Sequence, residues 1–146
     1  MHIQLPPTNG WMLELGRCSS SEPKSDFRCS YRIYITGDTM IIDELKEIPK
    51  RYAGQRIDLM LAHLGGAILP SPALLPKAVM VTMDGKQGVE LIKMIQPELT
   101  IPIHYDDYEV FASPLEDFQK VVEEARLGDK VVCLDRKEQY KFRVAD

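Results

Sequence analysis

Apolar and polar residues alternate from Tyr31 to Ile35, and the alternation stops at Thr36-Gly37-Asp38. A period of two residues predicts a half-buried strand, and the return strand of a hairpin is expected at Phe27–Ile35. Its partner is expected at Trp11–Leu15. The loop between them, residues 16–26, contains three consecutive serines and is longer than hairpin loops usually are. It is therefore predicted to be exposed.

A helix is predicted after Asp38, because four apolar residues follow at the spacing of one helix face. These residues are Ile41, Ile42, Leu45 and Ile48. Pro49 is expected to end this helix, since proline lacks the N–H of a regular turn. The almost continuous apolar run Ile57–Leu64 then predicts a buried parallel strand.

A second helix is expected over Gly85–Ile95, with Asp84 as its N-cap and Gln87 as the reciprocal partner. Thr82 is an alternative cap. Pro97 follows the helix, and Leu99–His104 has the pattern of the next strand. A strand, a helix and a parallel strand form a crossover unit, which is right-handed by default.

The last third of the chain predicts one more helix and two strands. Ser113-Pro114-Leu115-Glu116 is typical of a helix start with a serine cap, and Gly128 is expected to follow the helix end. Strands are expected at Lys130–Leu134 and Gln139–Val144. Earlier in the chain, Ala78–Met83 reads as a short strand after an apolar loop at 67–77 that the pattern does not place. The whole chain, 1–146, is predicted to be a single α/β domain.

The composition of the chain argues against several classes of function. The 146 residues suffice for one domain with a real core, and the net charge of −4 argues against a nucleic-acid or anionic-membrane surface. No apolar run approaches the roughly 18 residues that span a membrane, and the first residues lack the pattern of a secretory signal. Three cysteines without a CxxC pair favour reduced thiols and a cytoplasmic protein. Nucleophile-elbow, P-loop and dinucleotide-binding motifs are absent.

Two side chains carry the candidate chemistry. Asp38 follows one predicted strand and His104 ends another. Ligands of open α/β sheets bind beyond the carboxyl ends of the strands, so both residues are expected at one edge of the sheet, facing a common point. Asp38 is either a metal ligand there or the cap of the following helix.

Four short motifs in a fixed order resemble the C-terminal half of the metallo-β-lactamase superfamily. The similarity is greatest to the branch that includes ascorbate-6-phosphate lactonase and the phospholipase D acting on N-acyl phosphatidylethanolamine. The motifs are Thr36-Gly37-Asp38-Thr39, the run Asp58–Gly66 that ends in His63-Leu64-Gly65-Gly66, Val81-Thr82-Met83-Asp84, and the run Pro97–Tyr105 that ends in Ile103-His104-Tyr105. The resemblance extends from about residue 5 to residue 144.

The resemblance implies a fold and a metal site. The family fold is an αββα sandwich, of which this chain would supply one mixed sheet with helices on its outer face. Zinc is the usual metal, with manganese and iron as alternatives. The bridging carboxylate would be Asp38, and the histidine of the second metal would be His104; both would be catalytic. Four further residues are candidates for orienting the ligands: His63, Thr39, Thr82 and Tyr105. For His63, the alternative is a hydrogen-bonded histidine of the core.

The strongest family signature, a His-x-His-x-Asp-His loop that supplies most ligands of the first metal, is absent. Upstream of the first strand, His2 is the only histidine. A catalytic zinc takes three protein ligands, so the chain is expected to be half of a hydrolase: a truncated gene product, a fragment or a paralogue without its first half. Its substrates would be small esters, lactones or phosphodiesters, with weak or no activity alone. The alternative is a non-catalytic interaction module. An uncovered sheet face predicts a homo-oligomer.

Overall fold

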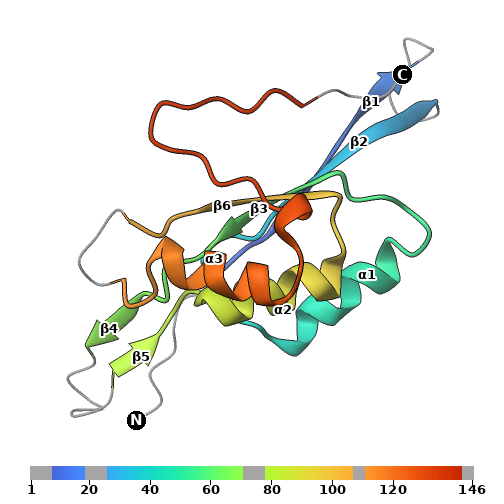
Figure 1. The fold of residues 1–146 in the computed structure, drawn as a ribbon. Helices are drawn as coiled ribbons and strands as arrows, with labels where there is room; N and C mark the ends of the chain where they lie inside the picture. The colour runs from blue at the N-terminus through green and yellow to red at the C-terminus, as the bar shows by residue number, and fades with distance from the viewer. Residues whose placement is uncertain (1–7, 19–25, 71–77, 107–110, 143–146) are drawn as a thin grey trace.

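A four-stranded mixed sheet forms the centre of the computed structural model, which describes residues 8–18, 26–70, 78–106 and 111–142. The spatial order of its strands is β1-β2-β3-β6 (Figure 1). β1 pairs with β2 in the antiparallel sense, and β2, β3 and β6 run parallel. The strands are β1 (Trp11–Cys18), β2 (Phe27–Ile35), β3 (Leu59–His63) and β6 (Leu99–Ile103).

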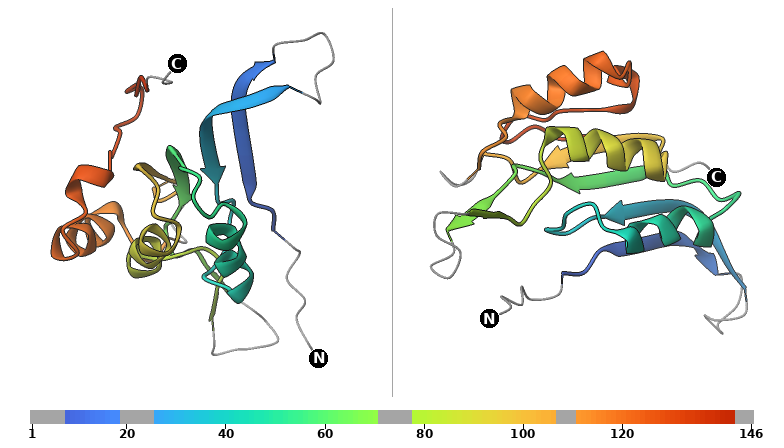
Figure 2. Two further views of the ribbon diagram at one scale, coloured as in Figure 1. Left: turned by 90° about the vertical axis from the view of Figure 1, so that its right-hand side faces the viewer. Right: turned by 90° about the horizontal axis from the view of Figure 1, so that it is seen from below.

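The helices lie side by side on one face of this sheet (Figure 2). They are η1 (Asp43–Lys46), α1 (Glu47–Arg51), α2 (Gly85–Ile95) and α3 (Leu115–Glu124), with a short 3-10 turn, η2 (Gly128–Lys130), after α3. A separate two-stranded antiparallel sheet consists of β4 (Ile68–Pro70) and β5 (Ala78–Met80). This arrangement is one mixed sheet with helices on one face, as predicted.

The hairpin of β1 and β2 is longer than the hydrophobic pattern indicated. β2 has the predicted bounds, but β1 continues through Gly16 to Cys18. The register shifts between Leu15 and Gly16, where a Cβ at position 16 would lie 2.0 Å from the carbonyl oxygen of Arg28. Glycine therefore allows the irregular pairing that extends the strand. Of the predicted loop, residues 19–25 lie outside the described residues.

The expectation that Pro49 ends the first helix is wrong. The segment begins as the 3-10 turn η1 and continues as α1, in which Pro49 is the third residue. Proline is tolerated in the first turn of an α-helix because the N–H groups there have no intrahelical acceptor. The 3-10 turn moves the start of the α-helix downstream, which brings Pro49 into that permissive turn.

Of the two later helices, α2 agrees with the sequence in extent, whereas α3 ends at Glu124, short of the predicted end next to Gly128, and its capping also differs. α2 has the predicted bounds, and the Asp84 carboxylate accepts a hydrogen bond of 2.8 Å from the Gln87 N–H. Ser113 does not cap its own helix, because its hydroxyl accepts a 3.0 Å hydrogen bond from the N–H of Gly85. Ser113 thus satisfies an N–H of the first turn of α2 and ties α3 to it.

The two predicted C-terminal strands do not form among the described residues. Val131 makes one isolated parallel bridge with Thr100, and the N–H of Val132 donates to the Thr100 carbonyl at 2.9 Å. Pairing with β6 goes no further, and residues 139–142 form no strand. Instead, the chain crosses the sheet face opposite the helices, where the Phe142 ring stacks on Tyr31 at 4.7 Å between centroids. Residues 131–142 are called the C-terminal strap below.

The sheet separates two apolar clusters, which are buried from solvent to different extents. On the helix side, Met60, Leu91 and Phe118 are almost completely buried. On the other side, the strap buries only Tyr31, Leu59 and Ile101 deeply. Further along this second face the apolar residues of β1 stay exposed: Trp11, Leu13 and Leu15. This side of the sheet is called the helix-free face.

Candidate metal centre at the carboxyl edge of the sheet

The carboxyl ends of β2, β3 and β6 meet at one edge of the sheet, because these three strands are parallel and in register. Asp38 follows β2, His63 is the last residue of β3, and His104 follows β6. The candidate residues thus come from three neighbouring strands. This is the edge at which open α/β sheets bind their ligands.

Asp38 and His104 are adjacent. Oδ1 of Asp38 lies 3.7 Å from Nδ1 of His104, and their side chains are 51% and 24% exposed. The predicted proximity of the two side chains is confirmed. The alternative role of Asp38 as a helix cap is not supported, because the residue before η1 is Ile42 and no side chain caps that turn. The carboxylate instead faces the histidine.

The backbone of His104 is strained at the point where it presents the imidazole. Its φ angle is +63°, a left-handed value that a non-glycine residue adopts at a cost of roughly 1–3 kcal/mol. Nδ1 of His104 lies 3.4 Å from the Leu64 carbonyl oxygen, and the Phe111 ring meets the imidazole edge-on at 4.9 Å. A histidine that donates Nδ1–H to a carbonyl keeps Nε2 free to ligate a metal.

Glycines let the loops at this edge approach one another. Gly65 has a φ of +102°, and a Cβ there would lie 2.7 Å from the His104 carbonyl oxygen. Gly37 has a φ of +65°, and its Cβ would lie 2.4 Å from the Asn9 carbonyl oxygen. The turn that presents Asp38 is therefore packed directly on the chain that enters β1.

Gly37→Ala is expected to destabilise the protein more than Gly54→Ala does. Both positions have positive φ, for which a side chain costs roughly 1–2 kcal/mol. At Gly54 nothing lies within 4 Å of the place that a Cβ would take, whereas at Gly37 the methyl group must also displace the Asn9 carbonyl. Urea unfolding at neutral pH measures both losses. Equal losses in the two variants would show that the close approach at Gly37 has no energetic role.

His63 reaches the site through a residue that the sequence analysis did not single out. The Thr36 hydroxyl accepts a 3.0 Å hydrogen bond from the His63 backbone N–H, donates to the Gly37 carbonyl at 3.0 Å, and lies 3.3 Å from His63 Nδ1. The rings of His63 and His104 are 5.8 Å apart between centroids. Burial lowers the pKa of His63; the Asp38 carboxylate opposes this shift, and His104 adds to it.

The hydroxyl groups of the other residues proposed to orient ligands form hydrogen bonds with backbone groups. Thr39 donates to the Met40 carbonyl at 3.1 Å, and Tyr105 donates to Leu134 in the strap at 3.3 Å. The Thr82 hydroxyl accepts from the Ala67 N–H at 2.7 Å and so does not cap α2. Each of these contacts positions a loop near the edge. His2 lies outside the described residues.

Asp38 and His104 could supply part of the coordination shell of a metal ion. The carboxylate and the imidazole come within 3.7 Å at their nearest atoms, Oδ1 of Asp38 and Nδ1 of His104, so both side chains can reach one divalent cation, whose ligands lie at about 2 Å in the case of zinc. Within the described part of the chain, no group of three or more His, Cys, Asp or Glu residues is arranged to hold a metal ion. These residues thus provide part of a coordination shell. A closed zinc site has four ligands.

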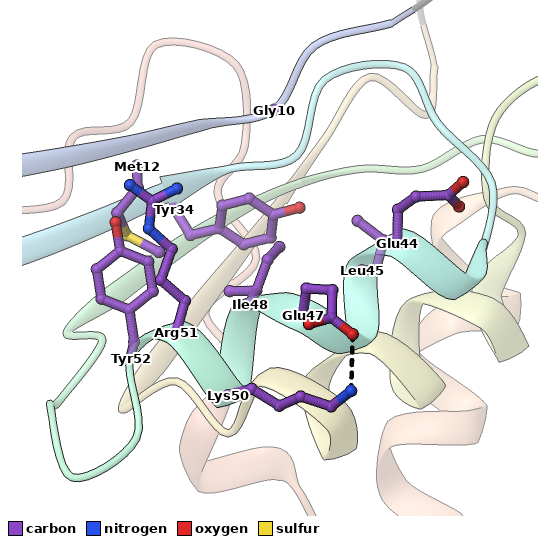
Figure 3. Close-up of a pocket in the computed structure, with 10 residues that line it drawn as sticks. All are labelled: Gly10, Met12, Tyr34, Glu44, Leu45, Glu47, Ile48, Lys50, Arg51 and Tyr52. Carbon is purple, nitrogen blue, oxygen red and sulfur yellow. Dashed lines mark hydrogen bonds and ion pairs between the residues drawn. The ribbon is translucent and has the colours of Figure 1, made fainter.

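A hollow beside the hairpin is separate from this edge. It measures about 700 Å³ and lies between the β1–β2 hairpin and η1–α1 (Figure 3). Burial of Tyr34 at its wall raises the pKa of the phenol to about 12. Lys50 and Glu47 at its rim pair with each other at 2.7 Å. None of the candidate metal ligands lines it.

Comparison with known proteins places this chain beside metal-dependent hydrolases. It is 32% identical over 111 residues to a UPF0173 metal-dependent hydrolase of Aeropyrum pernix and 30% identical over 110 residues to that of Hyperthermus butylicus. These matches cover 76% and 75% of the chain but 39% and 41% of the relatives. The chain thus spans less than half the length of the curated relatives that it matches. No family model matches it.

Solved structures agree in fold. An isothiocyanate hydrolase from Delia radicum gut bacteria superposes with a TM-score of 0.64 at 15% identity, over 96% of this chain and 60% of that one. The metallo hydrolase Igni18 of Ignicoccus hospitalis gives 0.59 at 21% identity, over 98% and 61%. The chain has half of a metallo-β-lactamase fold and is similar to metal-dependent hydrolases. Among the described residues, no helix has the length and apolar character to cross a membrane.

Proposed function

We propose that this chain carries one side of the zinc centre of a cytoplasmic metal-dependent hydrolase. The observation that supports the proposal most directly is the 3.7 Å approach of Asp38 and His104 at the edge where three parallel strands end. The similarity to metal-dependent hydrolases supports a metal at this edge. The choice of zinc rests on the donor types, because carboxylate oxygen and imidazole nitrogen are normal zinc ligands.

In this proposal, Asp38 would hold the metal through a carboxylate oxygen and His104 through Nε2. The bound metal would polarise the substrate and provide a nucleophile from water at neutral pH. The chain's own contribution is to orient these two donors. The Leu64 carbonyl fixes the His104 imidazole through Nδ1, and the Gly37 turn presents Asp38. The resemblance to the lactonase and phospholipase D branch suggests ester, lactone or phosphodiester substrates.

Two donors do not complete a catalytic zinc site, which takes three protein ligands and an open position. The remaining ligands would have to come from outside the described residues, and this chain covers only 41% and 39% of two of its relatives. We therefore expect at most trace hydrolysis by the chain alone.

Hydrolysis of a p-nitrophenyl ester, a lactone and bis(p-nitrophenyl) phosphate in the presence of zinc tests this function. Trace turnover above the zinc blank should disappear in Asp38→Ala and in His104→Ala, and persist in Asp43→Ala. Asp43 is a suitable control because it is an exposed carboxylate paired with Lys46. Turnover that survives the first two substitutions would place the reaction elsewhere.

A non-catalytic interaction module is the second candidate function. The exposed apolar residues of the helix-free face favour it, because soluble monomers rarely expose large contiguous apolar patches. A module of this kind would associate with its partner equally well with zinc and with a chelator. Association that requires zinc would argue against it.

A further inference from the structure

His63 and His104 present a common arrangement at the carboxyl edge of the sheet. In each imidazole, Nδ1 faces an oxygen of the protein: the Leu64 carbonyl for His104 and the Thr36 hydroxyl for His63. Nδ1 of a neutral histidine that donates to such an oxygen leaves Nε2 as an acceptor. For His104 this acceptor belongs to the proposed metal site. His63 has no assigned role.

The hydrogen atoms around Thr36 determine which nitrogen of His63 carries the proton. The Thr36 hydroxyl has one proton, and the Gly37 carbonyl accepts it at 3.0 Å. The hydroxyl oxygen therefore presents only lone pairs to its other neighbours. It accepts the His63 backbone N–H at 3.0 Å and faces His63 Nδ1 at 3.3 Å. This second contact is attractive only if Nδ1 carries a proton, since two lone pairs would otherwise face each other.

The Thr36 hydroxyl is well placed to impose this choice. Thr36 is only 1% exposed, and its own N–H donates to Leu61 of β3 at 3.1 Å. The residue is thus fixed between the ends of β2 and β3, and its side chain cannot turn to solvent. By register, His63 shares the helix-free face with Ile103, next to the strand that leads to His104. An imidazole among apolar neighbours there would be an unusual choice for packing alone.

We propose that His63 is a third functional group of the Asp38–His104 site, held by Thr36 with its proton on Nδ1 so that Nε2 accepts a hydrogen bond from bound substrate or water. This role rests on the proposed metal centre. It is a substrate-binding role, because no three ligands are arranged for a metal among the described residues. Thr36 is then a positioning residue, acting through His63.

Nitrogen-15 NMR of the imidazoles tests the tautomer directly, because the chain has only three histidines. His63→Gln and His104→Gln assign the signals. In the wild type at pH 7.5, His63 should show a protonated Nδ1 and an unprotonated Nε2. Thr36→Ser, which keeps the hydroxyl, should preserve this state, and Thr36→Val should shift it toward the Nε2–H form. A wild-type His63 with its proton on Nε2 would overturn the proposal even if Thr36→Val fails to fold.

Protection against diethyl pyrocarbonate, which modifies neutral imidazole nitrogens, tests whether Nε2 of His63 belongs to the site. Peptide mass spectrometry resolves the three histidines. With zinc and inorganic phosphate added together, the phosphate standing in for a bound substrate, slower modification of both His63 and His104, and unchanged modification of His2, is expected. Protection of His104 alone would exclude His63 from the site. If neither histidine is protected, both the metal centre and the role of His63 in it are contradicted. The NMR result tests the contact between Thr36 and His63 independently of the metal centre.

Discussion

Calorimetric titration with zinc chloride is expected to give micromolar or weaker binding to the chain, and no binding to the Asp38→Ala/His104→Ala double variant. The affinity is low because two donors supply only part of the four-ligand shell that makes structural zinc sites tight. The effect of the substitutions is large because the two side chains come within 3.7 Å of each other and would share one ion. Removing either leaves a single ligand, so each single variant should also bind zinc far more weakly.

Two controls separate this site from adventitious binding. Asp43→Ala removes an exposed carboxylate that pairs with Lys46, and His2→Ala removes the histidine that lies upstream of β1. Both variants should retain the wild-type affinity. Tight zinc binding that persists in the double variant would show that the metal site lies elsewhere, and loss of binding in His2→Ala would assign His2 to the coordination shell.

The sequence predicted the proximity of Asp38 and His104 because it depends on local patterns and one topological rule. Each residue follows a recognisable apolar strand, and parallel strands have their carboxyl ends at a common edge. The contact between Thr36 and His63 was not predicted, since it joins residues 27 positions apart through a hydroxyl whose direction depends on the Gly37 turn. The Thr36-Gly37-Asp38 motif contained that threonine, but nothing in one sequence distinguished it from an ordinary strand end.

In the fold, too, features that depend on neighbouring residues were predictable, and features that depend on long-range packing were not. α2 was predicted with its bounds and its Asp84 cap, because spacing and capping are encoded within a few residues. The serine before α3 was assigned to the wrong helix, since its bond to Gly85 depends on how α2 and α3 pack. The two strands predicted at the C-terminus form the C-terminal strap instead. Its apolar residues bury surface by lying across the helix-free face. The alternation of apolar and polar residues in the sequence is the same for such a segment as for a paired strand.

The helix-free face leads to the second large effect, which is self-association of the isolated chain. Trp11, Leu13 and Leu15 alternate along β1, an edge strand, and are 62%, 41% and 42% exposed. Their partners by register in β2 lie on the same face, but the strap covers mainly the β3–β6 side. In two-layer sandwiches such a face is buried against a second sheet. We propose that a second copy supplies this cover when the chain is alone, because isologous pairing buries the same patch on both partners.

Sedimentation velocity at micromolar concentration should therefore show a dimer or larger species for the wild type. Leu13→Lys should shift the distribution strongly toward monomer, because a charge at the centre of the buried patch would lose its hydration. Ile42→Lys is the matched control: Ile42 is 44% exposed, but it directly precedes η1, on the helix side of the sheet. A compact wild-type monomer, or equal effects of the two lysines, would mean that the strap alone suffices to keep the helix-free face in water.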